Sequence, residues 1–171
     1  GDSQFKNLVL LEPPFMAEES EEIYRGKFLT YRKTSAQWEY VTRTNARGAV
    51  AILALTNDRQ VVLTEQYRPP VGRYVIELPA GLVGDIPLQE EEPLVTAAKR
   101  ELKEETGYEA KKWTMLSEGT SSAGLTDEFV TLFYATGLTR MTEGGGVGGE
   151  NIKVHFVHQA DVTKWCRDRQ G

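Results

Sequence analysis

Three glutamates on one predicted helix are the residues of this chain best suited to chemistry. Glu101, Glu104 and Glu105 share a helical face, because residues three and four positions apart are neighbours there. Like charges at this spacing repel each other by roughly a few tenths of a kcal/mol per pair. A bare cluster of this kind is often a solvated acidic face, but it is also the set of oxygen ligands that Mg²⁺ requires. We therefore predict a metal site with Glu101 and Glu105 as the main ligands and Glu104 beside them.

A fixed frame of residues surrounds these glutamates. Glu92 precedes Arg100 by eight positions. Gly107 follows Glu105 by two positions, where a helix end favours a left-handed residue. The frame opens with the Leu-Pro-Ala-Gly-Leu run at 78–82 and resembles the Nudix box, the signature of hydrolases that split a nucleoside diphosphate linked to another group. The resemblance implies a divalent cation as cofactor, Mg²⁺ or else Mn²⁺.

The spacing at the start of the box is longer than usual. Five residues normally separate the first glycine from the first glutamate, whereas ten lie between Gly81 and Glu92. The additional residues fall within 84–91, so we predict a loop insertion that leaves the helix intact. The resemblance also implies that the backbone carbonyl of Ala80 binds metal, and Gly81 allows the close approach of the chain that this requires.

Arg100 and one further carboxylate complete the predicted catalytic set. The resemblance implies that Arg100 pairs with the glutamates and orients them, a role that we favour over direct contact with phosphate. The identity of the general base is open between Glu150, Glu143 and a helix glutamate such as Glu104. We favour Glu150, because the glycine-rich stretch 144–149 precedes it and predicts a mobile loop that carries it over the site.

A second group of motifs resembles the ADP-ribose pyrophosphatase branch of the Nudix family. It comprises Trp38-Glu39, Arg43 and the runs 64–70 and 74–82. The resemblance implies that Trp38 stacks on the base and that Arg43 and Arg68 contact the nucleotide or its phosphates. It also places Glu77 and Leu82 in the substrate site. A flat ring suits a purine and a guanidinium suits phosphate, although packing within a strand is the alternative role for Trp38.

One position departs from that branch. Ala123 stands where ADP-ribose enzymes carry a proline about fifteen positions after the box, although the Gly-Leu-Thr-Asp-Glu tail at 124–128 is kept. We predict a metal-dependent hydrolase of nucleoside diphosphate sugars, ADP-ribose-like, that releases a nucleoside monophosphate and a sugar phosphate. The alternatives are a Nudix-fold sensor that binds such a nucleotide without cleaving it and a dinucleoside polyphosphate hydrolase. The base, the sugar, the attacked phosphorus and the number of metal ions stay open.

The resemblance also implies a homodimer. Members of the branch exchange their N-terminal strands, so residues 1–45 would help to build the partner's site. The residues that motivate this expectation are Trp38 and Arg43, which match nucleotide contacts yet lie well before the catalytic helix.

The composition narrows the class of partner and the compartment. Residues 85–109 hold eight acidic and three basic side chains, so they account for the whole net charge of −5 in this 171-residue chain. Such a surface repels phosphate backbones, and we expect no long nucleic acid as partner. No apolar run is long enough to span a membrane, and no secretory signal is visible. Cys166 is the only cysteine, so a cytoplasmic location is expected.

The predicted elements must position these residues. Hydrophobic patterning predicts a hairpin of strands over 22–34 and 37–44, further strands over 49–55, 60–66, 74–78, 111–118, 129–135 and 152–158, and helices over 93–106 and 162–170 with Asp161 as cap of the second. This pattern indicates an α/β protein, and the resemblance implies the Nudix fold. We expect an α/β/α sandwich with a mixed β-sheet over 46–171 and an N-terminal antiparallel β extension over 1–45.

Overall fold

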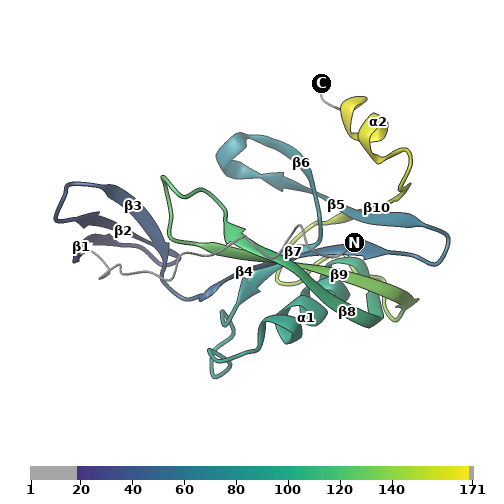
Figure 1. The fold of residues 1–171 in the computed structure, drawn as a ribbon, viewed down its shortest axis with the longest axis horizontal. Helices are drawn as coiled ribbons and strands as arrows, with labels where there is room; N and C mark the ends of the chain where they lie inside the picture. Colours follow the sequence, from purple (N-terminus) through teal and green to yellow (C-terminus); the bar gives the residue numbers. More distant parts are fainter. Residues whose placement is uncertain (1–18, 170–171) are drawn as a thin grey trace, which may run out of the picture.

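The computed structural model describes residues 19–169, so the prediction for residues 1–18 of the N-terminal extension lies outside the described residues. In the described residues, ten strands and two α-helices follow one another (Figure 1). Their bounds are β1 Ser20–Arg25, β2 Leu29–Thr34, β3 Glu39–Arg43, β4 Gly48–Leu55, β5 Gln60–Arg68, β6 Arg73–Glu77, β7 Ala80–Val83, α1 Leu94–Thr106, β8 Tyr108–Thr120, β9 Phe129–Arg140, β10 Lys153–His158 and α2 Val162–Arg167.

The larger of two sheets forms the centre of the molecule. Its strands lie in the order β10-β5-β4-β9-β8, and β6 pairs with β5 while β7 pairs with β4. The pairing of β4 with β9 is parallel and the other pairings are antiparallel, so the sheet is mixed as predicted. No helix in the described part of the chain is long and apolar enough to cross a bilayer.

The two helices cover opposite faces of this sheet. The even residues of β4, among them Val50 and Ile52, are fully buried in the cluster that contains Leu102 of α1. The odd residues Leu53 and Leu55 pack on the other face, in a second cluster that includes Trp165 of α2. The alternation along one strand therefore produces the expected α/β/α layering, with α1 and α2 on different sides of the sheet in Figure 1.

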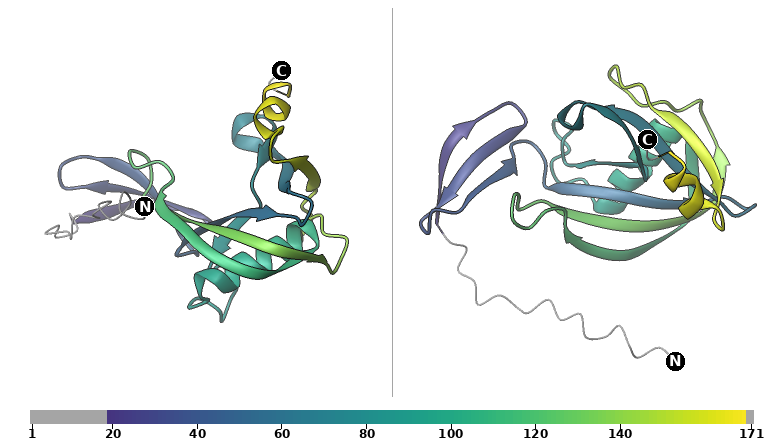
Figure 2. Two further views of the ribbon diagram at one scale, coloured as in Figure 1. Left: turned by 45° about the vertical axis from the view of Figure 1, so that its right-hand side comes forward. Right: turned by 90° about the horizontal axis from the view of Figure 1, so that it is seen from above.

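The N-terminal strands form a separate sheet of three strands, in the order β1-β2-β3. Figures 1 and 2 show it at one end of the molecule, beside the larger sheet rather than stacked upon it. The predicted single strand over 22–34 is wrong, because the chain turns back at Gly26, whose N–H donates to the carbonyl of Leu29 at 2.8 Å. The antiparallel extension is present, with one strand more than the predicted hairpin.

The termini of the helices explain two further outcomes. Helix α1 ends at Gly107, which has a φ of 79° and donates its N–H to the carbonyl of Lys103, so a left-handed end is present as predicted. Helix α2 ends at Arg167 rather than at 170, which lies outside the described residues. Asp161 precedes α2, but its side chain makes no capping hydrogen bond, so that part of the prediction is wrong.

Candidate active site

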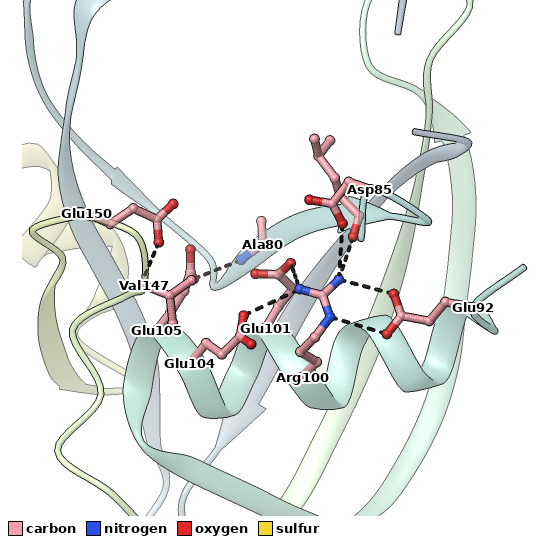
Figure 3. A network of polar contacts seen from close by, with 10 residues as sticks. Ala80, Asp85, Glu92, Arg100, Glu101, Glu104, Glu105, Val147 and Glu150 are labelled. Carbon is pink, nitrogen blue, oxygen red and sulfur yellow. Dashed lines mark hydrogen bonds and ion pairs between the residues drawn. The ribbon is translucent and has the colours of Figure 1, made fainter. Parts of the chain in front are cut away.

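Helix α1 turns two of its glutamates into the protein, toward β7. Glu101 and Glu105 are 9% and 4% exposed, and one oxygen of Glu105 accepts the N–H of Ala80 at 3.1 Å (Figure 3). Gly81 makes this approach possible, because a Cβ at that position would overlap the carboxyl group of Glu101. The glycine and the helix therefore bring the backbone of β7 and two carboxylates together.

Arg100 lies at the centre of a carboxylate network on the same helix. Its Nη1 lies 2.5 Å from Glu101 and 3.4 Å from Glu104. Its Nε and Nη2 both bind the buried carboxylate of Glu92, and Nη2 also donates to the carbonyl of Leu82 at 3.0 Å. Every guanidinium nitrogen is thus engaged within the protein, which supports an orienting role rather than contact with substrate.

Burial raises the pKa values of Glu101 and Glu105 and so favours their protonated forms. Burial raises the pKa of Glu105 to about 8, the N–H of Ala80 opposes this shift, and the neighbouring charges of Glu101 and Glu150 add to it. Burial likewise raises the pKa of Glu101 to about 7, although the charge of Arg100 acts in the opposite direction. Cationic charge near these carboxylates is therefore insufficient for both to be ionised at neutral pH.

The glycine-rich loop between β9 and β10 is tied to the end of α1. Gly145 and Gly146 donate their N–H groups to the carbonyls of Glu105 and Glu104, at 2.8 and 3.0 Å. Gly144 passes so close to the helix that a Cβ there would overlap backbone atoms of Thr106. Close passage past the helix end is a second reason for these glycines, and the mobility of the loop stays a prediction.

This anchoring separates the two loop candidates for the general base. Glu150 lies above Glu105 in Figure 3, and its carboxylate accepts the N–H of Val147 at 3.1 Å. Glu143 instead pairs with Arg140 at 2.9 Å, and its side chain is 94% exposed. Of the two, only Glu150 contributes to the cleft described next.

The carboxylates open into a cleft of about 320 Å³. Its lining combines acidic and basic groups, namely Arg43, Ala49, Gln66, Arg68, Ala80, Gly81, Leu82, Asp85, Glu101, Glu105 and Glu150. Seven of these are predicted site residues, from three strands, α1 and the loop after β9. Glu77, Glu104 and Arg100 do not line the cleft themselves, but Glu77 binds Arg68 and Glu104 binds Arg100.

Trp38 is the predicted site residue that the fold leaves far from this cleft. It is 57% exposed and lies just before β3, whereas Arg43 at the other end of β3 reaches the cleft. Five residues of extended chain separate the two by roughly 16 Å. The structure therefore places Arg43 at the cleft of its own chain and leaves Trp38 outside it.

Three cleft residues escaped the sequence reasoning. Gln66 lies two positions before Arg68 on β5, and strand alternation puts both on one face, which is a signal that the sequence carried. Asp85 belongs to the inserted loop and lies 3.4 Å from Arg100, which no spacing rule predicts. Ala49 contributes only a small side chain on β4, a position that composition does not distinguish.

The residues present fit a divalent cation by their chemistry. The buried pair Glu101 and Glu105 has raised pKa values in spite of Arg100 and Arg68, and Gly81 lets the Glu101 carboxyl lie directly against the backbone of β7. Among residues 19–169 no three acidic, histidine or cysteine side chains are yet gathered as a metal site, and Glu101 and Glu104 are instead bound to Arg100. Oxygen donors of this type are those that Mg²⁺ and Mn²⁺ take.

The NUDIX domain family matches residues 45–169, which include the whole carboxylate helix and the cleft strands. The chain belongs to this family. A solved structure titled an ADP compounds hydrolase has the same fold, with a TM-score of 0.68 over 88% of this chain and 82% of that one, at 22% sequence identity. The Nudix fold predicted from the box is thereby confirmed.

Curated relatives resemble this Nudix chain over part of its length. It is 43% identical over 124 residues to an ADP-ribose pyrophosphatase of Bacillus subtilis, which is 72% of this chain and 64% of that protein. It is 41% identical over 116 residues to a methanol dehydrogenase activator of Bacillus methanolicus, which is 68% of this chain and 58% of that protein. An ADP-sugar pyrophosphatase of Mus musculus is 36% identical over 54% of this chain and 48% of its own length. The chain thus spans about three fifths of the length of the first two.

Proposed function

We propose that this protein hydrolyses the diphosphate bond of nucleoside diphosphate sugars, with a divalent cation as cofactor. The observation that carries the proposal is a cleft in which two arginines, Arg43 and Arg68, share a wall with three carboxylates, Glu101, Glu105 and Glu150. Basic groups alone would suit any phosphate, and acidic groups alone would repel one. The names of the relatives, which concern ADP-ribose and ADP sugars, support the substrate class.

The arginines would bind the diphosphate. Among residues 19–169 each forms one ion pair through Nε, Arg43 with Glu128 and Arg68 with Glu77, and their terminal nitrogens have no hydrogen bond there. A guanidinium edge with two free donors matches two phosphate oxygens. Arg68 also acts electrostatically on Glu105, so bound phosphate would lie close to the carboxylate helix.

The cation would be held by Glu101, Glu105 and Glu104, with the carbonyl of Ala80 as a further ligand. When bound, Mg²⁺ neutralises charge on the diphosphate and lowers the pKa of water. Arg100 binds Glu101 and Glu104 and limits the positions that these carboxylates adopt.

Glu150 would act as general base. Its carboxylate takes a proton from the attacking water as the water oxygen bonds to phosphorus, and the bond between that phosphorus and the bridging oxygen breaks. The products are a nucleoside monophosphate and a sugar phosphate. The hydrogen bond from the N–H of Val147 holds Glu150 at the cleft while leaving its second oxygen available.

We also propose a homodimer in which Trp38 serves the partner's cleft. Trp38 matches a base-stacking residue yet lies outside the cleft of its own chain, and no aromatic side chain among residues 19–169 lines that cleft. The N-terminal sheet bears further exposed apolar side chains, Ile23, Tyr24 and Leu29, each at least 45% exposed. Exposed apolar groups clustered on one element favour a protein–protein contact.

A panel of nucleoside diphosphate sugars tests the activity. Each compound is incubated with the protein and Mg²⁺, and the products are separated by chromatography. We expect cleavage of at least one ADP sugar to a monophosphate and a sugar phosphate, with none in the presence of a chelator. Tight binding of a nucleotide sugar without cleavage would favour a sensor, and cleavage confined to dinucleoside polyphosphates would favour the other hydrolase.

A further inference from the structure

Two arginines at the cleft are held in the same manner. The Nε of Arg43 lies 2.7 Å from Glu128, and the Nε of Arg68 lies 2.8 Å from Glu77. In the described part of the chain, neither arginine uses its terminal nitrogens in a hydrogen bond. Arg100 differs, because its terminal nitrogens are bound to carboxylates and a carbonyl. The first two arginines are therefore oriented from behind, with their outer edges left for a ligand.

Glu128 is itself fixed on both oxygens. Its Oε1 accepts from Arg43 and its Oε2 accepts from the hydroxyl of Ser121 at 3.2 Å. Its N–H donates to the hydroxyl of Thr126, and its carbonyl accepts the N–H of Ser121 at 3.1 Å. The side chain is 13% exposed, so solvent competes little for it. The 121–128 loop between β8 and β9 thus presents Glu128 in one orientation.

The same loop also binds the strand that carries Arg43. The N–H of Val41 donates to the carbonyl of Leu125 at 2.9 Å, and Val41 forms a parallel bridge with Thr126. The 121–128 loop therefore contacts strand β3 at two points, through the backbone of Val41 and through the side chain of Arg43. Only the second point reaches the cleft, so loss of Glu128 would free the arginine while β3 keeps its backbone contact.

We propose that Glu128 is a positioning residue that orients Arg43 toward the diphosphate, an inference that rests on the proposed function. A carboxylate at Nε fixes the plane of the guanidinium, so both terminal donors reach phosphate oxygens together. Without that partner, Arg43 samples many rotamers, and binding must supply the lost side-chain entropy. The effect falls on substrate binding, because the phosphates are present in the ground state as well as in the transition state.

The test compares KM and kcat for Glu128→Ala, Arg43→Ala and the double variant, with the substrate that the wild type cleaves best. Glu109→Ala is the matched control, since Glu109 also forms an ion pair of 2.7 Å, with Lys103, but lies away from the cleft. We expect Glu128→Ala to raise KM about tenfold with kcat changed less than about threefold. The double variant should be no worse than Arg43→Ala, because residues that act as a unit are not additive.

A further variant separates orientation from simple attachment of β3. Arg43→Lys keeps the charge but has no Nε, so adding Glu128→Ala to it should change KM little. Glu128→Asp should recover part of the loss. Independent, multiplying effects of the two alanine substitutions would overturn the inference, as would an unchanged KM in Glu128→Ala or a loss seen only as a lower melting temperature. Wild-type protein that cleaves no compound would instead refute the proposed function itself.

Discussion

The carboxylate helix and the N-terminal sheet are built in opposite ways. Helix α1 buries Ala97, Ala98 and Leu102 completely and is supported by five strands of the larger sheet. Within residues 20–43, Thr30 is the one buried residue, and neither helix of the described part of the chain covers the three strands. An uncovered sheet of three short strands is only marginally stable in water. The carboxylates of α1 are therefore held by contacts within one chain, whereas the N-terminal sheet leaves apolar side chains exposed.

The largest effect is expected when a carboxylate is removed from helix α1. Glu105→Gln should lower kcat/KM at least about a hundredfold, because a lost metal ligand removes several kcal/mol of transition-state stabilisation. The fold should persist, since glutamine still accepts the N–H of Ala80. Kinetics in saturating Mg²⁺ and circular dichroism check both statements. Near wild-type turnover would contradict the metal-site assignment, and Glu109→Gln serves as the control.

A smaller effect is expected at the loop that bears the proposed base. Glu150→Gln should lower kcat roughly thirtyfold to a hundredfold and change KM far less, because a base acts in the transition state. Glu143→Gln is the matched control, since Glu143 lies on the same loop but pairs with Arg140. Steady-state rates for the two variants are the measurement. A larger loss in Glu143→Gln would reverse the two assignments.

The proposal that Trp38 of the N-terminal sheet serves the partner's cleft is tested by mixing subunits. Trp38→Ala alone should raise KM about tenfold through lost stacking. If Trp38 serves the partner, a dimer of one Trp38→Ala subunit and one Glu105→Gln subunit has one intact site and one site with both lesions. Activity should then recover toward half of wild type. With subunit exchange confirmed separately, no recovery would show that each subunit builds its own site.

The smallest effect concerns the pH dependence of the metal-free protein. Glu105 keeps its proton in the folded state to about pH 8, whereas in the unfolded chain its pKa returns to the ordinary 4.5. The unfolded state therefore binds fewer protons between these values, and stability falls as pH rises through this range. The melting temperature in chelator should drop by a few degrees from about pH 5 to about pH 8.

Two additions sharpen that measurement. Excess Mg²⁺ should stabilise the protein more at the higher pH, since cation binding requires ionised carboxylates. Glu105→Gln should flatten the dependence on pH in chelator. A melting temperature that rises between the two values in wild-type protein would show that the burial of Glu105 is not the controlling factor.

The two halves also differ in how far the sequence predicts them. The helix over 93–106 was predicted within one residue of α1, because periodicity, a terminal glycine and a signature motif all agree. The network around Arg100 followed from the same motif. In the N-terminal part, the turn at Gly26 was missed, since 22–34 reads as one β-rich stretch without a strong turn pair. Hydrophobic periodicity predicts an element well where one of its faces is buried and poorly where both faces are exposed.

Contacts between distant segments were the least predictable part of the site. Glu128 belongs to a motif that the sequence retains, but its bond to Arg43 spans 85 positions, and only the fold brings the two together. Likewise, the pairing of glycines 145 and 146 with the end of α1 could not be read from composition, which suggests flexibility for any glycine run. The tertiary geometry gives these residues a fixed partner instead.

The attachment of the glycine loop to α1 has a consequence for insertions and deletions. The side chain of Glu104 binds Arg100 and that of Glu105 accepts the N–H of Ala80, while their carbonyls accept the N–H groups of Gly146 and Gly145 respectively. Because Gly146 is bound to the helix, the number of residues between Gly146 and Glu150 determines where Glu150 lies relative to α1. One residue more or less in that interval would shift Glu150 by about 3 Å, the rise of an extended residue. The stretch 84–91, by contrast, already contains additional residues. We therefore expect the chain to tolerate changes in length before α1 but not between Gly146 and Glu150.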